Sequence, residues 1–195
     1  MRMTGERWRK SLAQFLAPVG LLAVMTVVPV TVAAPDAQAD TSFGGGCVLY
    51  PNNPAATVDS LRNSCSIEQQ VQIFAAAQRG DAPHGVTNGW VTSPQFMQVV
   101  APPFWIGKTF DTGPDGGTLM NRITGANIPG WPANVYSGPA ITDKRPAWLL
   151  DYGPSITPQI LDEIREVTPN VWFGYSWWRG HFQTTLLLTF VLTYP

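Results

Sequence analysis

The stretch DEIREVTPNVWFGYSWWRGHFQTTLLLTFVLTYP, residues 162–195, decides the fold. It is rich in Trp, Tyr, Phe, Val, Ile and Thr, the residue types that favour β-strands. Short breaks at 168–170 and 179–180 divide it into three expected strands over 162–167, 171–178 and 182–193. Because such tight turns join antiparallel neighbours, this part of the chain predicts an antiparallel sheet.

The same pattern extends upstream as far as residue 85, with Gly and Pro recurring between short apolar runs. Short helical crossings are expected over 94–100 and 156–161. With the five further strands given below, the chain has eight expected strands joined mostly by tight turns. This number and connection pattern favour a closed up-and-down barrel or a strongly curled sheet. The five further strands are expected over 86–92, 104–110, 118–124, 133–140 and 147–152.

Residues 1–39 have the order of residue types of a secretory signal peptide. A basic segment is followed by 15–34, which carries no charge, and then by the small-residue site Ala37-Gln38-Ala39. Cleavage there predicts an extracytoplasmic or secreted protein that begins at Asp40. The alternative is an uncleaved membrane anchor, because about twenty apolar residues span a bilayer. Contact with a membrane is expected only in that case.

The charge of the mature chain argues against a nucleic-acid partner. The chain has 12 basic and 13 acidic residues, and residues 1–39 hold four and two of them respectively. The rest therefore has a small net negative charge and no basic run, whereas nucleic-acid binding relies on clustered Lys and Arg. Nothing in the composition points to an oligomeric state.

Two features are expected between the signal peptide and the first strand. Cys47 and Cys65 are the two cysteines of the chain, and such a pair in an exported protein predicts a disulfide. It would close a segment over 40–65 that is expected to be flexible and loop-like. Ser66 and Gln69 form a capping box, which predicts one N-terminal helix that packs on the barrel within the domain over 66–195.

Five segments of the strand region carry a resemblance to a known group. Their order resembles that in largely uncharacterised bacterial proteins built on a lipocalin-like barrel, over about residues 67–193. The resemblance implies a lipocalin-like up-and-down fold and brings no established activity with it. The segments are WIGKTF (105–110), LMNRI (119–123), VYSGPAITDKRPAWLLDY (135–152), DEIREVTPNVWFGYSWW (162–178) and LLLTFVLTYP (186–195).

Charged residues inside apolar strands are the first candidates for a binding site. Asp151 follows an apolar run and should be partly buried, with Arg122 or Arg165 as its partner. That pair would be either structural or a contact for the polar group of a ligand. Glu163 and Arg165 share one face of their strand and could line the barrel mouth. They would there form either an anion anchor or a solvated ion pair.

Aromatic residues are the second set of candidates. Seven of the eight Trp residues lie within 90–178. Their rings either fill the barrel as core or wall an apolar cavity, for which Tyr136, Trp148 and Tyr175 are candidates. Alternation places Tyr175 on one face of its strand and Ser176 on the other, and both faces carry aromatic rings. One face should therefore be covered by the helix or stay exposed.

These observations favour a protein that binds a small apolar or amphipathic molecule. Two other classes remain open: a filled barrel with a structural or interaction role, and an enzyme. The enzyme would use Asp151 or Glu163 as general acid-base and Arg122 or Arg165 to stabilise an anion. The sequence has no nucleophile elbow, no H-E-x-x-H and no phosphate loop, and its two His residues stand apart, so no metal or cofactor is expected.

Overall fold

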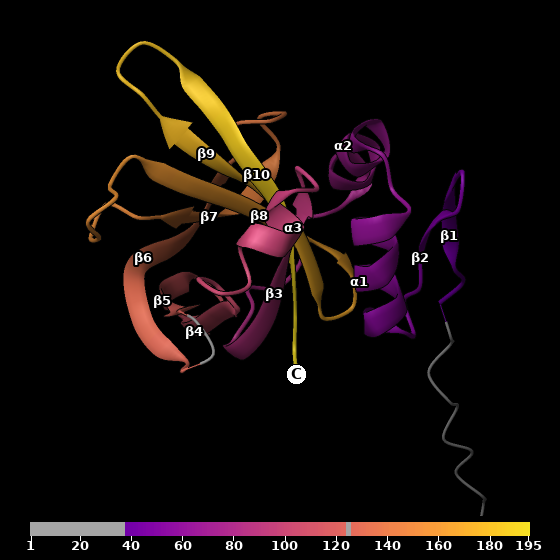
Figure 1. The fold of residues 1–195 in the computed structure, drawn as a ribbon, viewed down its shortest axis with the longest axis horizontal. Helices are drawn as coiled ribbons and strands as arrows, with labels where there is room; N and C mark the ends of the chain where they lie inside the picture. Colours follow the sequence, from indigo (N-terminus) through magenta and orange to yellow (C-terminus); the bar gives the residue numbers. More distant parts are fainter. Residues whose placement is uncertain (1–37, 124–125) are drawn as a thin grey trace, which may run out of the picture. The chain divides into compact units, whose positions relative to one another are not determined.

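The computed structural model describes residues 38–123 and 126–195, which form a closed eight-stranded barrel with a smaller N-terminal layer beside it (Figure 1). The expected signal peptide, except for its last two residues, lies outside the described residues. Within the described ranges, no helix combines the length and the apolar character needed to cross a membrane.

Each barrel strand pairs antiparallel with the next one along the chain, and the last strand pairs with the first to close the ring. The eight strands correspond one to one with the eight expected from the sequence, so the closed antiparallel barrel is confirmed. The strands are β3 (Gly85–Ser93), β4 (Gly107–Gly113), β5 (Gly116–Ile123), β6 (Ile128–Pro139), β7 (Pro146–Asp151), β8 (Ile160–Thr168), β9 (Val171–Arg179) and β10 (Thr184–Thr193).

The expected crossing at 94–100 contains the short helix α3 (Met97–Val100), between β3 and β4. The second crossing, expected to be helical over 156–161, was predicted wrongly. That connection is built from turns, and β8 begins at Ile160. There the Ser155 hydroxyl accepts a hydrogen bond from the backbone N–H of Thr157. Such local side-chain bonds to the backbone compete with helix formation.

The N-terminal layer is more ordered than the sequence suggested. Residues expected to form a flexible loop contain a two-stranded hairpin and a helix, so two helices precede the barrel instead of one. The helix begins where Asn53 caps the backbone N–H of Ala56 and Pro54 occupies the first turn. The Pro and Asn residues there mark a helix start. The elements are β1 (Thr41–Gly44), β2 (Cys47–Leu49), α1 (Pro54–Asn63) and α2 (Ile67–Ala76).

Two expectations for this layer are confirmed. α2 starts at the predicted capping box, in which the Ser66 side chain accepts from the Gln69 backbone and the Gln69 side chain accepts from the Ser66 backbone. Cys47 and Cys65 form a disulfide with their Cα atoms 4.6 Å apart. The disulfide joins β2 to the link between α1 and α2, so it cross-links two parts of the N-terminal layer and does not connect that layer to the barrel.

The barrel strands separate two apolar cores. The inner core fills part of the barrel and includes Trp148, Ile164 and Trp172. The outer core lies between the barrel and the N-terminal layer, where Phe74 of α2 packs edge-to-face against Tyr175 with ring centroids 4.9 Å apart. Both faces of β9 are therefore aromatic, and of the two alternatives left open by the sequence the structure shows the covered one, with the N-terminal layer on one face.

Candidate functional site

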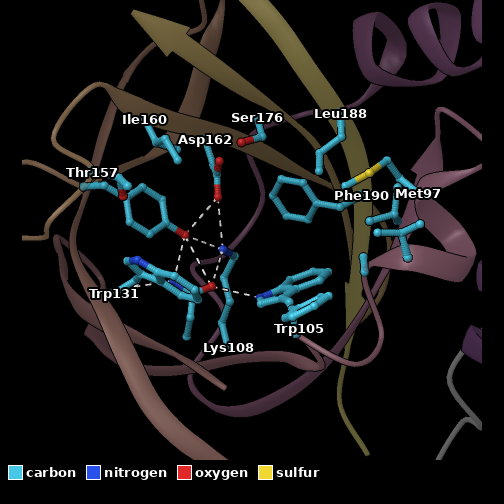
Figure 2. Close-up of a pocket in the computed structure, with 16 residues that line it drawn as sticks. Met97, Trp105, Lys108, Trp131, Thr157, Ile160, Asp162, Ser176, Leu188 and Phe190 are labelled. Atoms are coloured by element: carbon cyan, nitrogen blue, oxygen red, sulfur yellow. Dashed lines mark hydrogen bonds and ion pairs between the residues drawn. The ribbon is translucent and has the colours of Figure 1, made fainter. Parts of the chain in front are cut away.

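One end of the barrel interior is hollow. A cavity of about 330 Å³ lies there, between inward-facing strand residues and α3 (Figure 2). Its walls are apolar and include Val91, Leu188 and Phe190. Trp105 packs edge-to-face against Phe190 with ring centroids 5.8 Å apart, and Met97 of α3 adds a flexible thioether. A guest molecule would meet mostly carbon on these sides.

The cavity opens to solvent along a rim of exposed apolar side chains. Phe104 is 61% exposed, Val100 49% and Trp131 37%, and all three line the cavity. They come from α3, from the segment that follows it and from β6. The cavity is therefore bordered by apolar side chains that also face solvent.

Four buried polar side chains form a hydrogen-bonded cluster against the apolar walls, the inner network of Lys108, Asn121, Tyr152 and Asp162 (Figure 2). Lys108 Nζ lies 3.0 Å from Asp162 Oδ2, 3.0 Å from Asn121 Oδ1 and 2.5 Å from the Tyr152 hydroxyl. Burial lowers the pKa of Lys108, and attraction to Asp162 opposes this shift. An ammonium group has three protons, and each of them has an acceptor here.

The other members of the inner network are also well bonded. The Asn121 amide donates to the Tyr152 hydroxyl at 3.0 Å and to the Trp131 carbonyl at 2.9 Å, and its oxygen accepts from Trp105 Nε1 at 2.9 Å. The Tyr152 hydroxyl lies 3.1 Å from Asp162 Oδ2. Burial and the Asp162 carboxylate raise the pKa of Tyr152 well above 10, so it stays a neutral phenol.

Asp162 Oδ1 is the exception. Five buried side-chain polar atoms lack a partner among the described residues, and this oxygen is the one that belongs to a residue lining the barrel cavity. Its cross-strand neighbour on β9 is Ser176, which also lines the cavity (Figure 2). The Ser176 side-chain hydroxyl makes no hydrogen bond within residues 38–123 and 126–195. The site thus places an unpartnered carboxylate oxygen and a hydroxyl at the wall of a cavity whose other lining residues are mostly apolar.

None of the seven candidate residues from the sequence lines this cavity. Glu163, Arg165 and Tyr175 belong to the buried layer between the barrel and the N-terminal elements, away from the barrel mouth. Glu163 does not pair with Arg165: it accepts from the backbone of Ile141 and from Thr142. The proposed Glu163/Arg165 ligand anchor at the barrel mouth was therefore misplaced.

Arg165 forms a structural ion pair of its own. Its guanidinium binds both oxygens of Asp143, at 2.6 and 2.7 Å. This hydrogen bonding holds the pKa of Asp143 below its ordinary value. Arg165 also donates to the carbonyls of Phe74 at 2.8 Å, of Pro146 at 3.0 Å and of Arg145 at 3.1 Å. Every nitrogen of this buried guanidinium is thus bonded to protein, with none left for a ligand.

Asp151 has a partner other than the two expected. It binds Arg179 at 2.7 Å, and neither Arg122 nor Arg165 contacts it. Burial raises the pKa of Asp151, but hydrogen bonds from Arg179 and from a backbone N–H outweigh this and lower the pKa overall. The half-exposed Tyr136 donates to the same carboxylate at 3.3 Å. Arg122 binds Asn88, Asn127 and a backbone carbonyl instead.

Trp148 does face the barrel interior, but it belongs to the filled end. It is buried in the inner core, its Nε1 donates to the Gly80 carbonyl at 3.2 Å, and the Arg79 guanidinium lies over its ring. The interior therefore has one packed end and one hollow end. Trp148 contributes to the packed end, so it fills space as core.

Three of the seven candidates lie one residue away from members of the inner network. Arg122, Asp151 and Glu163 are the immediate neighbours of three members of the inner network, Asn121, Tyr152 and Asp162. Since successive side chains of a strand point to opposite faces, a shift of one residue exchanges the inside for the outside. All four members lie within the segments GKTF, MNR, LDY and DEIR, so the motif order was the signal that could have found them.

Comparisons with known proteins assign no function to this site. No family model and no curated protein matches the chain. The crystal structure of a protein from Thermomonospora curvata is similar over 67% of this chain and 88% of that one, with 16% identity and a TM-score of 0.46. That level of similarity carries no argument about activity. Among the described residues, no three His, Cys, Asp or Glu side chains group in a way that could hold a metal ion.

Proposed function

We propose that the protein binds a small amphipathic molecule in the hollow end of its barrel. The observation that carries the proposal is the cavity, which combines apolar walls, an open rim and an unpaired buried carboxylate oxygen. Ligand sites are typically concave and mostly apolar, with a few placed polar groups that orient the guest. The order of sequence segments that resembles lipocalin-like proteins also predicts that this barrel is lipocalin-like. That assignment stays a prediction.

The size of the cavity limits the guest to a compact molecule. Its volume of about 330 Å³ lies at the lower end of the range for ligand pockets. It corresponds to the space of roughly ten water molecules at about 30 Å³ each. A short alkyl chain or a small ring system fits this space, with the polar end directed at Asp162 and the apolar body against Trp105 and Phe190.

The hollow end favours binding over a filled barrel with a purely structural role. Trp148 and Trp172 pack the opposite end of the interior. A barrel that only needed a core would gain stability from filling the remaining space, because apolar contacts are lost around a void. The enzyme hypothesis has less support, since Asp151, Glu163, Arg122 and Arg165 do not lie on the cavity.

The proposal includes export. A disulfide persists in oxidising compartments, so the bond between Cys47 and Cys65 is compatible with an extracytoplasmic location. N-terminal sequencing of protein recovered from the culture medium or the periplasm should begin at Asp40. A start at Met1 in a membrane fraction would contradict cleavage and indicate a tethered barrel.

Isothermal titration of delipidated protein with 1-octanol tests the binding function. Leu188 lines the cavity, whereas its neighbour Leu187 does not and is 42% exposed. The Leu188→Trp variant should lose binding because its larger ring occupies the cavity, and Leu187→Trp should bind as the wild type does. Equal binding by both variants, or no binding by the wild type to any small amphiphile, would overturn the proposal.

A further inference from the structure

The geometry points to a more specific guest, a neutral molecule whose polar end is a hydroxyl group that donates a hydrogen bond to Asp162 Oδ1. This inference rests on the proposed binding function and specifies the chemical class of the ligand. Its support comes from the hydrogen-bond inventory of the inner network, from the burial of that network and from its charge balance.

The cation of the site is not free to bind an anionic ligand. The three protons of the Lys108 ammonium are directed at Asp162, Asn121 and Tyr152. A carboxylate or phosphate head group that entered the cavity would find no free proton on Lys108. It would instead meet the Asp162 carboxylate, and two like charges in a buried site repel each other strongly. The site therefore discriminates against anions.

The one polar atom of the inner network that has no hydrogen-bond partner among the described residues is an acceptor, Asp162 Oδ1. Asp162 is 3% exposed, and its Oδ1 has no partner among the described residues although its Oδ2 binds Lys108 and Tyr152. A buried acceptor without a partner costs free energy, which a donor on the ligand would recover. An ether or a ketone has no proton to give, so it would leave this oxygen unpaired.

The charge balance selects a hydroxyl over an ammonium group. Lys108 and Asp162 form an ion pair whose charges cancel. An alkylammonium guest would add an uncompensated positive charge to the buried site and would lose its own hydration. A neutral hydroxyl adds no charge. Ser176, the cross-strand neighbour of Asp162, places a second hydroxyl beside the same position, where it could donate to the ligand oxygen.

A series of guests of nearly equal length tests the inference on the wild-type protein. The series consists of 1-octanol, 1-methoxyheptane, octanoate and octylammonium, each titrated by calorimetry at neutral pH. We expect 1-octanol to bind about ten- to a hundredfold more tightly than the ether, as one hydrogen bond to a charged acceptor implies, and octanoate to bind most weakly. Octylammonium should bind less tightly than 1-octanol.

Two neighbouring variants locate the effect. Asp162→Asn removes the charge of the acceptor and should reduce the preference for 1-octanol over 1-methoxyheptane about tenfold. Glu163→Gln changes the next residue, which faces the outer layer, and should leave the preference unchanged. If Asp162→Asn does not fold, Ser176→Ala combined with the wild-type series still decides the question, and it should lower 1-octanol affinity only a few-fold.

The outcomes separate the two proposals. Tight binding of octanoate, of octylammonium or of the ether at the level of 1-octanol overturns the hydroxyl inference and leaves the binding function standing. An absence of binding across the whole series, with no response to Leu188→Trp, overturns the binding function itself. Loss of the preference in Glu163→Gln but not in Asp162→Asn would also contradict the assignment to Asp162.

Discussion

Two buried ionic clusters lie back to back on strand β8, and they differ in how completely they are bonded. Asp162 points into the barrel and belongs to the inner network. Glu163 and Arg165 point to the other side and, with Asp143, form what we call the outer network. Both clusters remove charges from water, so each must be compensated by bonds within the protein.

The outer network is saturated and joins separate parts of the fold. Arg165 binds Asp143 and three backbone carbonyls, one of which belongs to Phe74 in α2. Glu163 accepts from the turn that connects β6 and β7. The inner network leaves one oxygen open beside a cavity. The comparison shows that burial of charge alone does not mark a binding site, because the outer network is also largely buried and has every side-chain donor and acceptor bonded within the protein. Our proposal of a binding site therefore rests on the unpartnered oxygen beside the cavity.

The largest expected effect comes from breaking the outer network. Arg165→Met removes a fully buried cation together with its hydrogen bonds to Asp143 and to three backbone carbonyls. The free energy of unfolding should fall by about 3–5 kcal/mol, as it does when one partner of a buried pair is removed. Urea denaturation measures this loss. The folded fraction should still bind 1-octanol with the wild-type affinity, and a selective loss of binding would contradict a purely structural role.

Paired substitutions should separate the two networks. Lys108→Met alone leaves Asp162 buried without a cation and should cost about 3–5 kcal/mol. Adding Asp162→Asn removes the remaining charge and should restore stability to within about 1 kcal/mol of the wild type, while the preference for 1-octanol is lost. Denaturation and calorimetry on both variants report the two effects.

The corresponding pair in the outer network should not recover. Arg165→Met combined with Asp143→Asn still removes the hydrogen bonds that Arg165 donates to the carbonyls of Phe74 and Pro146, whereas the Arg145 carbonyl keeps its bond from the Ala140 backbone N–H. Its free energy of unfolding should therefore stay close to that of Arg165→Met alone. Recovery of this double variant to the wild-type level would show that the outer network is as replaceable as the inner one, and the contrast between the two networks would fail.

A smaller effect is expected from pH. Hydrogen bonds from Arg165 hold the pKa of Asp143 below its ordinary value of 3.8, so the native state binds this proton less readily than the unfolded state does. The stabilisation is fully present above the unfolded-state pKa and is lost as pH falls through the lower native value. The stability difference between the wild type and Asp143→Asn should thus narrow below about pH 4. Denaturation curves from pH 6 to pH 3 check this, and a constant difference would argue against it.

Most of the fold could be predicted from the sequence because the signals are local. The eight strands follow from short runs of β-branched and aromatic residues between turns, and α2 follows from the capping box at Ser66 and Gln69. The helix α1 was missed because its start, with Asn53 and Pro54, has the same residue types as a loop. A helix cap and a turn use the same chemistry, and only the residues after the cap distinguish a helix from a loop.

The site could be predicted only in part, because the inward face of each strand is fixed by distant contacts. On β8 and β9 both faces carry polar or aromatic residues, so alternation alone does not say which face is inside. The packing of Phe74 against Phe173 and Tyr175 decides it, over a separation that no local pattern reveals. With that face known, Asp162 and Ser176 are identified as interior residues.

The most direct test of the binding site compares the two ends of the barrel interior by NMR. In a ¹⁵N-labelled sample titrated with 1-octanol, the indole N–H of Trp105, which lines the cavity and donates to Asn121, should shift and saturate. The indole N–H of Trp148, in the packed end, should not move. A titration that shifts Trp148 or leaves Trp105 unchanged would contradict a ligand in the hollow end.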